Sequence, residues 1–361
     1  MGMIKQILLC LIILSLSACE EIIPLESELK SDRITLSAVV TPDTVVYAFI
    51  TEAYDLDYFE TIKLRSDYYD YDKVLYPRNQ MFRDTIAEKT ILKNANVELV
   101  VNDAERYPMY YDSLCLTYNS SYVPKYGDKI NIRVDSMTIC DEKGVRKHFD
   151  KAEAVAMFPS TTPKIEILEK KLSYKEREYY TVIDVADTVA ITDYWGADTV
   201  MTVKIKIKDP GNEKNYYRLL VRSVGASRLY AGSYSAAYPL YLCVDEFKSK
   251  DLLFYDSDLV KPYGYLPAYF SNVFDDELIN GKEYEFTVET RMRRASEITP
   301  YVIIELQNLS PDLYYYLKDI EVFRINDFDL YDNPIQINCN VTGGWGVLGA
   351  MTYDTHMVPF K

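Results

Sequence analysis

The sequence predicts a mostly β protein of two tandem β-sandwich-like domains, with one short helix near the C-terminus. Three observations support this fold class. Apolar and polar residues alternate along many short segments, turn-forming residues separate these segments, and a helical period of apolar residues occurs in one place. We expect an immunoglobulin-like sandwich over residues 33–160 and a β-rich C-terminal domain over residues 161–361.

The N-terminal residues 1–18 have the character of a secretory signal peptide. Lys5 is the only charge ahead of an apolar run from Ile7, and Leu16-Ser17-Ala18-Cys19 follows this run. The run has about ten residues, whereas a membrane-spanning helix needs roughly 20. We therefore predict cleavage after Ala18 and lipid attachment to Cys19. The alternative is an uncleaved anchor in which Cys19 is a buried cysteine.

Residues 19–32 are expected to form a solvated tether, because charged residues interrupt this stretch and leave little to bury. The whole chain carries a net charge of −15. This charge disfavours binding to nucleic acid phosphates and to anionic lipid surfaces, both of which attract basic residues. The expected membrane contact is therefore the lipid on Cys19, with multiple acyl chains giving durable attachment.

The segments expected to be strands in the N-terminal half alternate with a period of two. Ile34, Leu36 and Ala38 alternate with polar residues, and residues 44–51 resume the pattern after Pro42-Asp43, which predicts a hairpin. Further strands are expected over residues 95–101, with Asn102-Asp103 as the following turn, and over 113–118, 129–135 and 152–158. Pro159 and Pro163 cannot both lie within a β-ladder, so we place the domain boundary there.

Residues 54–86 are rich in tyrosine and aspartate and largely lack the alternation of a strand. The run Asp67 to Asp72 contains Tyr68, Tyr69 and Tyr71 between three aspartates. Burying this run would remove unpaired charges from water, so we expect the three tyrosines to face solvent on a loop. Its spacing does not match a calcium-binding EF-hand loop. These three tyrosines are the predicted contact for a ligand or partner.

Four cysteines remain in the mature chain after Cys10 is removed and Cys19 is lipidated. None of these pairs has the C-x-x-C spacing of zinc or thioredoxin-like sites. The compartment permits disulfides, and Cys115–Cys140 and Cys243–Cys339 would keep each bridge within one expected domain. Free thiols are the alternative, because a chain of this length does not need disulfides to fold.

The C-terminal half repeats the period of two. Val203, Ile205 and Ile207 alternate with three lysines, which predicts a strand. The following Asp209-Pro210-Gly211-Asn212 predicts a type II turn, after which a return strand runs through Tyr217. Two more strands are expected over residues 284–288 and 302–306. Residues 310–320 are the predicted helix, with Ser310 as its N-cap, Pro311 in its first turn, and Leu313, Leu317 and Ile320 on one face.

The sequence contains one match to a cofactor-binding motif, and the residues around it do not fit that motif. Gly344-Trp345-Gly346-Val347-Leu348-Gly349 matches G-x-G-x-x-G, but the chain ends 12 residues later, where a nucleotide-binding fold would need a helix and a second strand. We predict instead a glycine-rich bend where the backbones of two strands approach closely. No Walker loop, G-x-S-x-G or H-E-x-x-H occurs, so we expect no catalytic residues, metal or cofactor.

The mature chain resembles a family of Bacteroidota lipoproteins known as domain of unknown function 4249. This resemblance is carried by the lipobox and by an ordered series of segments. These segments are Asp209-Pro210-Gly211, Asn215-Tyr216-Tyr217-Arg218, Phe274-Asp275-Asp276, Asn280-Gly281, Leu309-Ser310 with Tyr314 and Tyr316, and Asn340 to Gly344 continuing through Gly349-Ala350. The resemblance implies attachment to the outer membrane and genes near TonB-dependent transporters. It implies no known activity and no catalytic residues.

We therefore expect a non-enzymatic outer-membrane lipoprotein that binds a ligand or assists a TonB-dependent transporter. Two other classes of function remain open. A surface glycan hydrolase would need two carboxylates that converge in a cleft. A structural or adhesive surface subunit could also be built from tandem sandwiches.

Overall fold

A computed structural model describes residues 33–53, 91–140, 146–184, 187–211, 213–226, 240–245, 247–256, 270–292, 301–325 and 336–359. Of these, residues 174–184, 187–199, 223–226, 240–245, 291–292 and 323–325 are described by their backbone alone.

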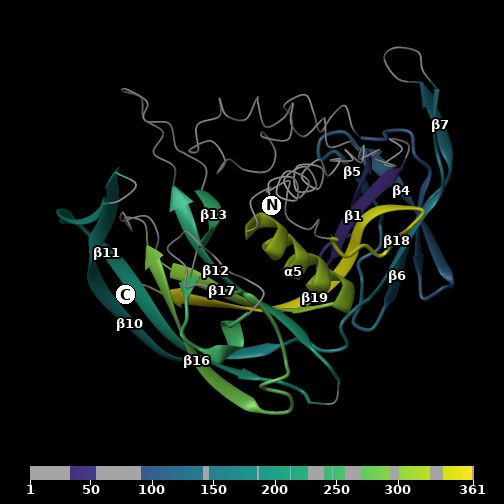
Figure 1. Cartoon of the computed structure of the whole chain (residues 1–361). Coiled ribbons are helices and arrows are strands. Elements are labelled where there is room, and N and C mark those ends of the chain that lie inside the picture. Colours follow the sequence, from purple (N-terminus) through teal and green to yellow (C-terminus); the bar gives the residue numbers. More distant parts are fainter. Residues whose placement is uncertain are drawn as a thin grey trace, which may run out of the picture.

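The described residues form one large curled sheet, a smaller sheet and a helix (Figure 1). The strands of the large sheet are, in sheet order, β13 (Leu240–Asp245), β12 (Tyr216–Ala226), β17 (Tyr301–Leu309), β19 (Gly344–Pro359), β1 (Ile34–Val40), β2 (Tyr47–Glu52), β5 (Thr117–Asn119), β4 (Glu105–Asp112), β3 (Val97–Val101), β6 (Lys129–Val134), β9 (Ala152–Met157) and β18 (Val341–Thr342), with β15 (Val273–Asp275) also paired to β12.

The smaller sheet has four strands in the order β10 (Lys164–Asp184), β11 (Asp187–Lys208), β16 (Glu283–Met292) and β14 (Phe247–Lys248). A separate hairpin joins β7 (Met137–Cys140) to β8 (Arg146–Phe149). The α-helix is α5 (Pro311–Ile325), and a short 3₁₀ helix, η2, spans Leu252–Phe254. The expected fold class, mostly β with one helix near the C-terminus, is confirmed.

The strand predictions hold in most places and fail in two. The first hairpin is present, since β1 and β2 pair antiparallel, and Asn102 and Asp103 form the turn after β3 with positive φ angles of 52° and 59°. The predicted strand over residues 113–118 is wrong, because residues 113–116 form a turn and β5 begins at Thr117. The strand predicted through Tyr217 is present as β12, but its place as the return strand of a hairpin with β11 is wrong, because β12 pairs with β17 in the other sheet.

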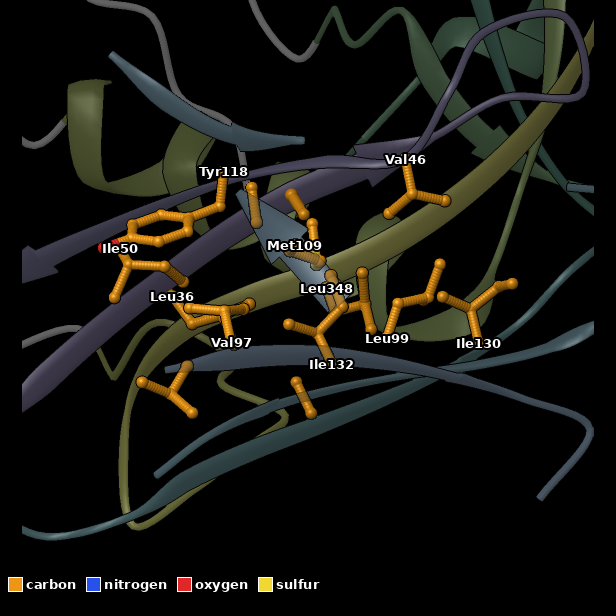
Figure 2. Packing of buried hydrophobic residues seen from close by; sticks show 14 of the residues in the cluster. Leu36, Val46, Ile50, Val97, Leu99, Met109, Tyr118, Ile130, Ile132 and Leu348 are labelled. Atoms are coloured by element: carbon orange, nitrogen blue, oxygen red, sulfur yellow. The ribbon is translucent and has the colours of Figure 1, made fainter. Parts of the chain in front are cut away.

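The first hydrophobic cluster lies inside the curl made by β19, β1, β2, β5, β4, β3, β6, β9 and β18. Every second residue of these strands points inward, as the burial alternation of β1 and β9 shows. Figure 2 shows this cluster, with Tyr118 beside Ile50, and with Leu99 and Ile132 near Leu348; all five are almost inaccessible to solvent. Because β9 contacts both β1 and β19, the curled sheet faces itself across this cluster like a sandwich.

The second hydrophobic cluster lies between the two sheets of the C-terminal half. Met201, Val203 and Ile205 of β11 face Leu219 of β12 and Ile304 of β17. Aromatic rings around Phe254 close one side of this cluster. This half is therefore a sandwich of the four-stranded sheet against β12, β17 and the end of β19.

Strand β19 belongs to both clusters. Its first half pairs in parallel with β1, and its second half pairs antiparallel with β17 (Figure 1). Leu348 and Ala350 pack in the first cluster, whereas Val358 packs in the second. We expected a boundary near residue 160, and the second cluster does begin at Ile165. Residues 341–350 nevertheless return to the first cluster, so the two clusters do not divide the chain at one point.

The predicted glycine-rich bend is wrong, because Gly344 to Gly349 lie within the strand β19, but the close approach of two strands predicted there is confirmed. A Cβ at Gly344 would overlap the carbonyl oxygen of Ile34, and a Cβ at Gly346 would overlap that of Leu36. Gly346 also has a φ of +111°, which side chains rarely adopt. The Asn340 side chain bonds both backbone groups of Leu348 and the carbonyl of Val155, which fixes the segment against β9.

A buried carboxylate fixes the crossing from β11 to β12. The Asp209 side chain, 3% exposed, accepts hydrogen bonds from the Tyr217 hydroxyl (2.6 Å) and from the backbone N–H groups of Gly211 (3.0 Å) and Gly281 (2.8 Å). Gly211 and Gly281 pack so closely that a Cβ on Gly211 would overlap Gly281. Beside them, the Asp276 carboxylate accepts from the backbone N–H of Asn215. We call these residues the Asp209 bracket.

Helix α5 covers one face of the large sheet over the neighbouring strands β12, β17, β19 and β1. Leu313 and Leu317 pack against Val39 and Met351, as the predicted apolar face requires. Ser310 occupies the predicted N-cap position, because its backbone carbonyl accepts the first intrahelical hydrogen bond from the N–H of Tyr314. Its hydroxyl accepts from the N–H of Ala350 on β19. Ser310 therefore attaches the start of the helix to β19.

We predict that Gly346→Ala destabilises the fold by at least about 3 kcal/mol, because the added methyl group must displace the backbone of β1. Gly127→Ala is the matched control. Gly127 has a φ of +79° and nothing near its position for a Cβ, so this substitution costs only the backbone strain of about 1 kcal/mol. Denaturant midpoints measure both. Equal losses would contradict the close approach of β1 and β19.

We predict that Tyr217→Phe costs about 1–2 kcal/mol of unfolding free energy, because it removes a hydrogen bond from a buried carboxylate. Tyr284→Phe makes the same chemical change where the hydroxyl donates to Asp251 at a partly buried site, and should cost about 0.5 kcal/mol or less. Urea unfolding of both variants tests this difference. A Tyr217→Phe protein as stable as the parent would show that the Asp209 bracket does not hold the crossing.

Candidate ligand-binding recess

Two of the predicted sites lie outside the described residues. These are the lipidation site Cys19 and the tyrosine cluster Tyr68, Tyr69 and Tyr71. The possible disulfides fall partly within the structure. Cys115 and Cys140 are exposed free cysteines, and Cys339 is a partly buried free cysteine. The side chain of Cys243 is outside the described residues.

A shallow recess of about 540 Å³ lies at the turn between β4 and β5. Its lining comes from the end of β4, the turn and the residues after β5. The lining residues are Pro108, Tyr110, Tyr111, Asp112, Ser113, Leu114, Asn119, Ser120 and Ser121. Sequence reasoning missed this recess, although Tyr110-Tyr111-Asp112 repeats the Tyr-Tyr-Asp order of the predicted cluster at Tyr68-Tyr69-Asp70.

The turn brings polar groups from both strands together. Asp112 accepts a hydrogen bond from the backbone N–H of Leu114 at 2.8 Å, and the Asn119 amide donates to Asp112 at 3.5 Å. Leu116 has a positive φ of 59°, which reverses the chain so that Thr117 pairs with Asp112. This reversal was not expected, because a leucine rarely adopts that conformation.

The lining has the chemistry of a site for hydroxyl-rich ligands. The Tyr110 ring is 70% exposed and presents an apolar face, as sugar rings and aromatic ligands require. Asp112, Asn119 and the serines offer acceptors and donors beside it. Leu114, also largely exposed, adds an apolar edge.

The electrostatics of the recess do not favour nucleophilic catalysis. The negative charge of Asp112 raises the pKa of the adjacent Cys115 thiol. A thiol with a raised pKa remains protonated at neutral pH and is a poor nucleophile. Asp112 is the one carboxylate among the described lining residues, whereas glycoside hydrolysis uses two.

The recess lies at the end of the sheet where the chain departs after β2 and rejoins at Ile91, and where the predicted tether ends at Arg33. The turn at residues 113–116 lies beside the end of β2, where residues 54–90 begin. These residues return at Ile91, which bridges Thr51. The Tyr118 hydroxyl then fixes the returning chain, since it donates to the Leu92 carbonyl and accepts from the Ala95 N–H. Arg33, where the predicted tether ends, bonds Ala53 at the same end.

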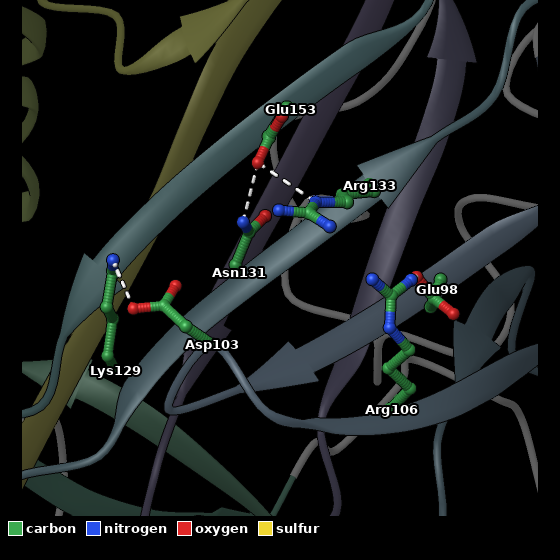
Figure 3. Close-up of polar contacts among 7 residues, drawn as sticks. All are labelled: Glu98, Asp103, Arg106, Lys129, Asn131, Arg133 and Glu153. Carbon is green, nitrogen blue, oxygen red and sulfur yellow. Dashed lines mark hydrogen bonds and ion pairs between the residues drawn. The ribbon is translucent and has the colours of Figure 1, made fainter.

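The charged outer face of the first sheet is better explained as a solvated surface than as a site. Figure 3 shows Glu153 bonded to Asn131 and Arg133, with Arg106–Glu98 and Lys129–Asp103 as further pairs. Hydrogen bonds from Asn131 and Arg133 lower the pKa of Glu153, so this carboxylate stays ionised and is unsuited to act as a general acid.

The Asp209 bracket is the place where two buried carboxylates approach. Burial, and then the charge of Asp209, raise the pKa of Asp276, an environment that can mark a catalytic acid. Here the oxygens of Asp209 are occupied by Tyr217 and two backbone groups, and both aspartates are almost fully buried. We therefore assign the bracket a structural role.

In the part of the chain that the structure describes, no group of three or more His, Cys, Asp or Glu residues is arranged to hold a metal ion. Among the same residues, no helix has both the length and the apolar character needed to cross a bilayer.

Comparisons with known proteins place the chain in a family. No curated protein matches its sequence. A solved structure from Corynebacterium diphtheriae, described as a "Putative membrane anchored protein", resembles it at 9% identity with a TM-score of 0.18, over 77% of this chain and 55% of that one. This chain thus spans about half the length of that protein. The family model described as "Domain of unknown function (DUF4249)" matches residues 23–356. The chain therefore belongs to the DUF4249 family, as its sequence indicated.

Proposed function

We propose that this protein is a lipid-anchored outer-membrane protein that binds a hydroxyl-rich ligand, of which a glycan is the best fit, without catalysis. The observation that carries this proposal is the recess at β4 and β5. An exposed tyrosine face beside a carboxylate, an amide and hydroxyls can stack on one face of a sugar ring and bond its hydroxyls.

The position of the recess supports a role next to a membrane partner. The predicted tether joins β1 at Arg33, at the same end of the sheet as the recess turn. From Cys19 to Arg33 there are 33 − 19 = 14 residue steps, which span at most about 50 Å when extended. A ligand held here would lie within reach of a transporter in the same membrane. We therefore favour an accessory role for a TonB-dependent transporter.

Two other functions have less support. A glycan hydrolase would need a second carboxylate facing Asp112, and the described lining offers none. An adhesive subunit would bind another surface and would need no soluble ligand. The experiment below separates these functions, since a hydrolase would cleave the bound glycan and an adhesin that lacks a glycan site would bind none.

We predict that Tyr110→Ala and Asp112→Asn each weaken glycan binding about tenfold, because each removes one contact worth about 1.4 kcal/mol. A glycan array identifies the best-bound sugar, and calorimetry with that sugar measures affinity. Tyr126→Ala, which removes another exposed tyrosine outside the recess, should bind as the parent does. A parent protein that binds no glycan, or variants with unchanged affinity, would contradict the proposal.

We predict that Cys19→Ala abolishes incorporation of labelled palmitate and releases the protein from membranes or leaves it as an uncleaved precursor. Cys10→Ala is the control, because Cys10 lies in the segment expected to be removed and should leave lipid attachment intact. Processed Cys19→Ala protein that stays on membranes through a high-salt wash would show that the lipid is not the anchor.

A further inference from the structure

The outer face of the sheet around the first cluster changes its chemistry from one group of strands to the next. On β3, β6 and β9 this face carries the charged pairs of Figure 3, which keep it solvated. On β2, β1 and the first residues of β19 the outward positions carry no charge, although 26% of the chain is charged. These positions are Tyr47, Phe49 and Thr51 on β2, Thr35, Ser37 and Val39 on β1, and Trp345 and Val347 on β19.

Aromatic rings on this uncharged face are open to solvent. Phe49 is 42% exposed and Trp345 is 38% exposed. The Tyr47 ring meets Phe49 edge to face, with 6.4 Å between the ring centroids. Beside Trp345, the Arg33 guanidinium lies 5.0 Å from the centre of the indole ring and brings N–H donors to this end of the face. We call Tyr47, Phe49 and Trp345 the aromatic strip. Exposed apolar surface with polar groups at its rim is typical of a binding site.

The aromatic strip is continuous with the recess. Asn119 of β5 pairs with Tyr47 on one side and with Tyr110 on the other. Directly paired residues lie on the same face of a sheet, so these three side chains form one row across β2, β5 and β4. The strand order here is β19-β1-β2-β5-β4. The recess and the aromatic strip therefore form one surface that extends over five neighbouring strands.

The distances between the rings suit a chain of linked sugars. Neighbouring strands lie about 4.8 Å apart, so Tyr110 and Tyr47, two strands apart in one row, are separated by about 10 Å. Phe49 and Trp345 are also two strands apart and are offset by two residues along the strands, which separates them by about 12 Å. One sugar ring covers one aromatic ring and does not reach the next. Several linked sugars can contact all of them.

From this continuity we infer that the protein binds an extended oligosaccharide, which begins in the recess at Tyr110 and runs over Phe49 to Trp345. This inference rests on the proposed glycan binding at the recess and adds the form of the glycan. Each exposed ring stacks on the apolar face of one sugar, and Thr35 and Ser37 on β1, between the rings, offer hydroxyl groups to the sugar. The uncharged face favours a neutral glycan.

The dependence of affinity on glycan length tests this inference. A glycan array identifies the best-bound sugar, and calorimetry measures the affinities for its monosaccharide and its hexasaccharide. We expect the parent to bind the hexasaccharide at least about tenfold more tightly, because only the longer chain reaches the aromatic strip. Phe49→Ser with Trp345→Ser should remove this gain and leave the affinity for the monosaccharide unchanged. Tyr110→Ala, in the recess, should weaken the binding of both sugars.

Two further variants are the controls. Phe49→Tyr with Trp345→Tyr keeps an aromatic ring at each position and should bind the hexasaccharide as the parent does, which shows that the rings themselves carry the gain. Tyr126→Ser removes an exposed ring outside the recess and the aromatic strip, and should change neither affinity. Circular dichroism establishes that each variant is folded.

The possible results separate this inference from the proposed function. Equal affinities of the parent for the two sugars would overturn the inference and leave the proposed function standing. A folded Phe49→Ser, Trp345→Ser protein that keeps the full gain would do the same. If that protein keeps the gain and no longer binds phosphatidylethanolamine vesicles, the aromatic strip contacts the membrane and the inference is overturned. A parent that binds neither sugar would overturn the inference and the proposed function together.

Discussion

The parallel pairing of the first strand with the last is the constraint on which the rest of this structure depends. Strand β1 follows directly on the predicted tether, and β19 ends the described chain, yet they are neighbours over seven residue pairs. This contact is possible because Gly344 and Gly346 present no side chain to the carbonyls of Ile34 and Leu36. The pairing closes the first cluster and, through the length of β19, joins it to the second.

Further contacts attach helix α5 and the segment around Thr161 to β19 and its neighbour β17. Ser310 and Gly349 let helix α5 lie close on β19, since a Cβ at Gly349 would come within 2.8 Å of Leu313. Thr161 lies between Pro159 and Pro163, and its backbone carbonyl accepts hydrogen bonds from the side chains of Thr352 and Asn308. The Asp209 bracket holds the crossing between the sheets. The segments that carry the family resemblance thus lie at these attachments, whereas the residues lining the recess lie outside those segments.

Local patterns in the sequence were sufficient for much of the fold. Alternation predicted strands such as β6 and β9, and the apolar face of residues 313–320 predicted α5. Pairing across long sequence distances was not predictable. The return of residues 341–350 to the first cluster depends on contacts with residues three hundred positions earlier, and the missed crossing after Gly211 depends on a carboxylate that bonds Gly281, 72 positions away. The recess was missed because a leucine with positive φ reverses the chain between Asp112 and Thr117.

The central claim of this account is that β19 makes the two clusters one cooperative unit. Hydrogen exchange across a denaturant series tests this most directly, followed separately at amides of β6 in the first cluster and β17 in the second. If β19 joins the clusters, both sets of amides lose protection at the same denaturant concentration and with the same dependence on denaturant. Loss of protection in one cluster while the other stays protected would contradict the account.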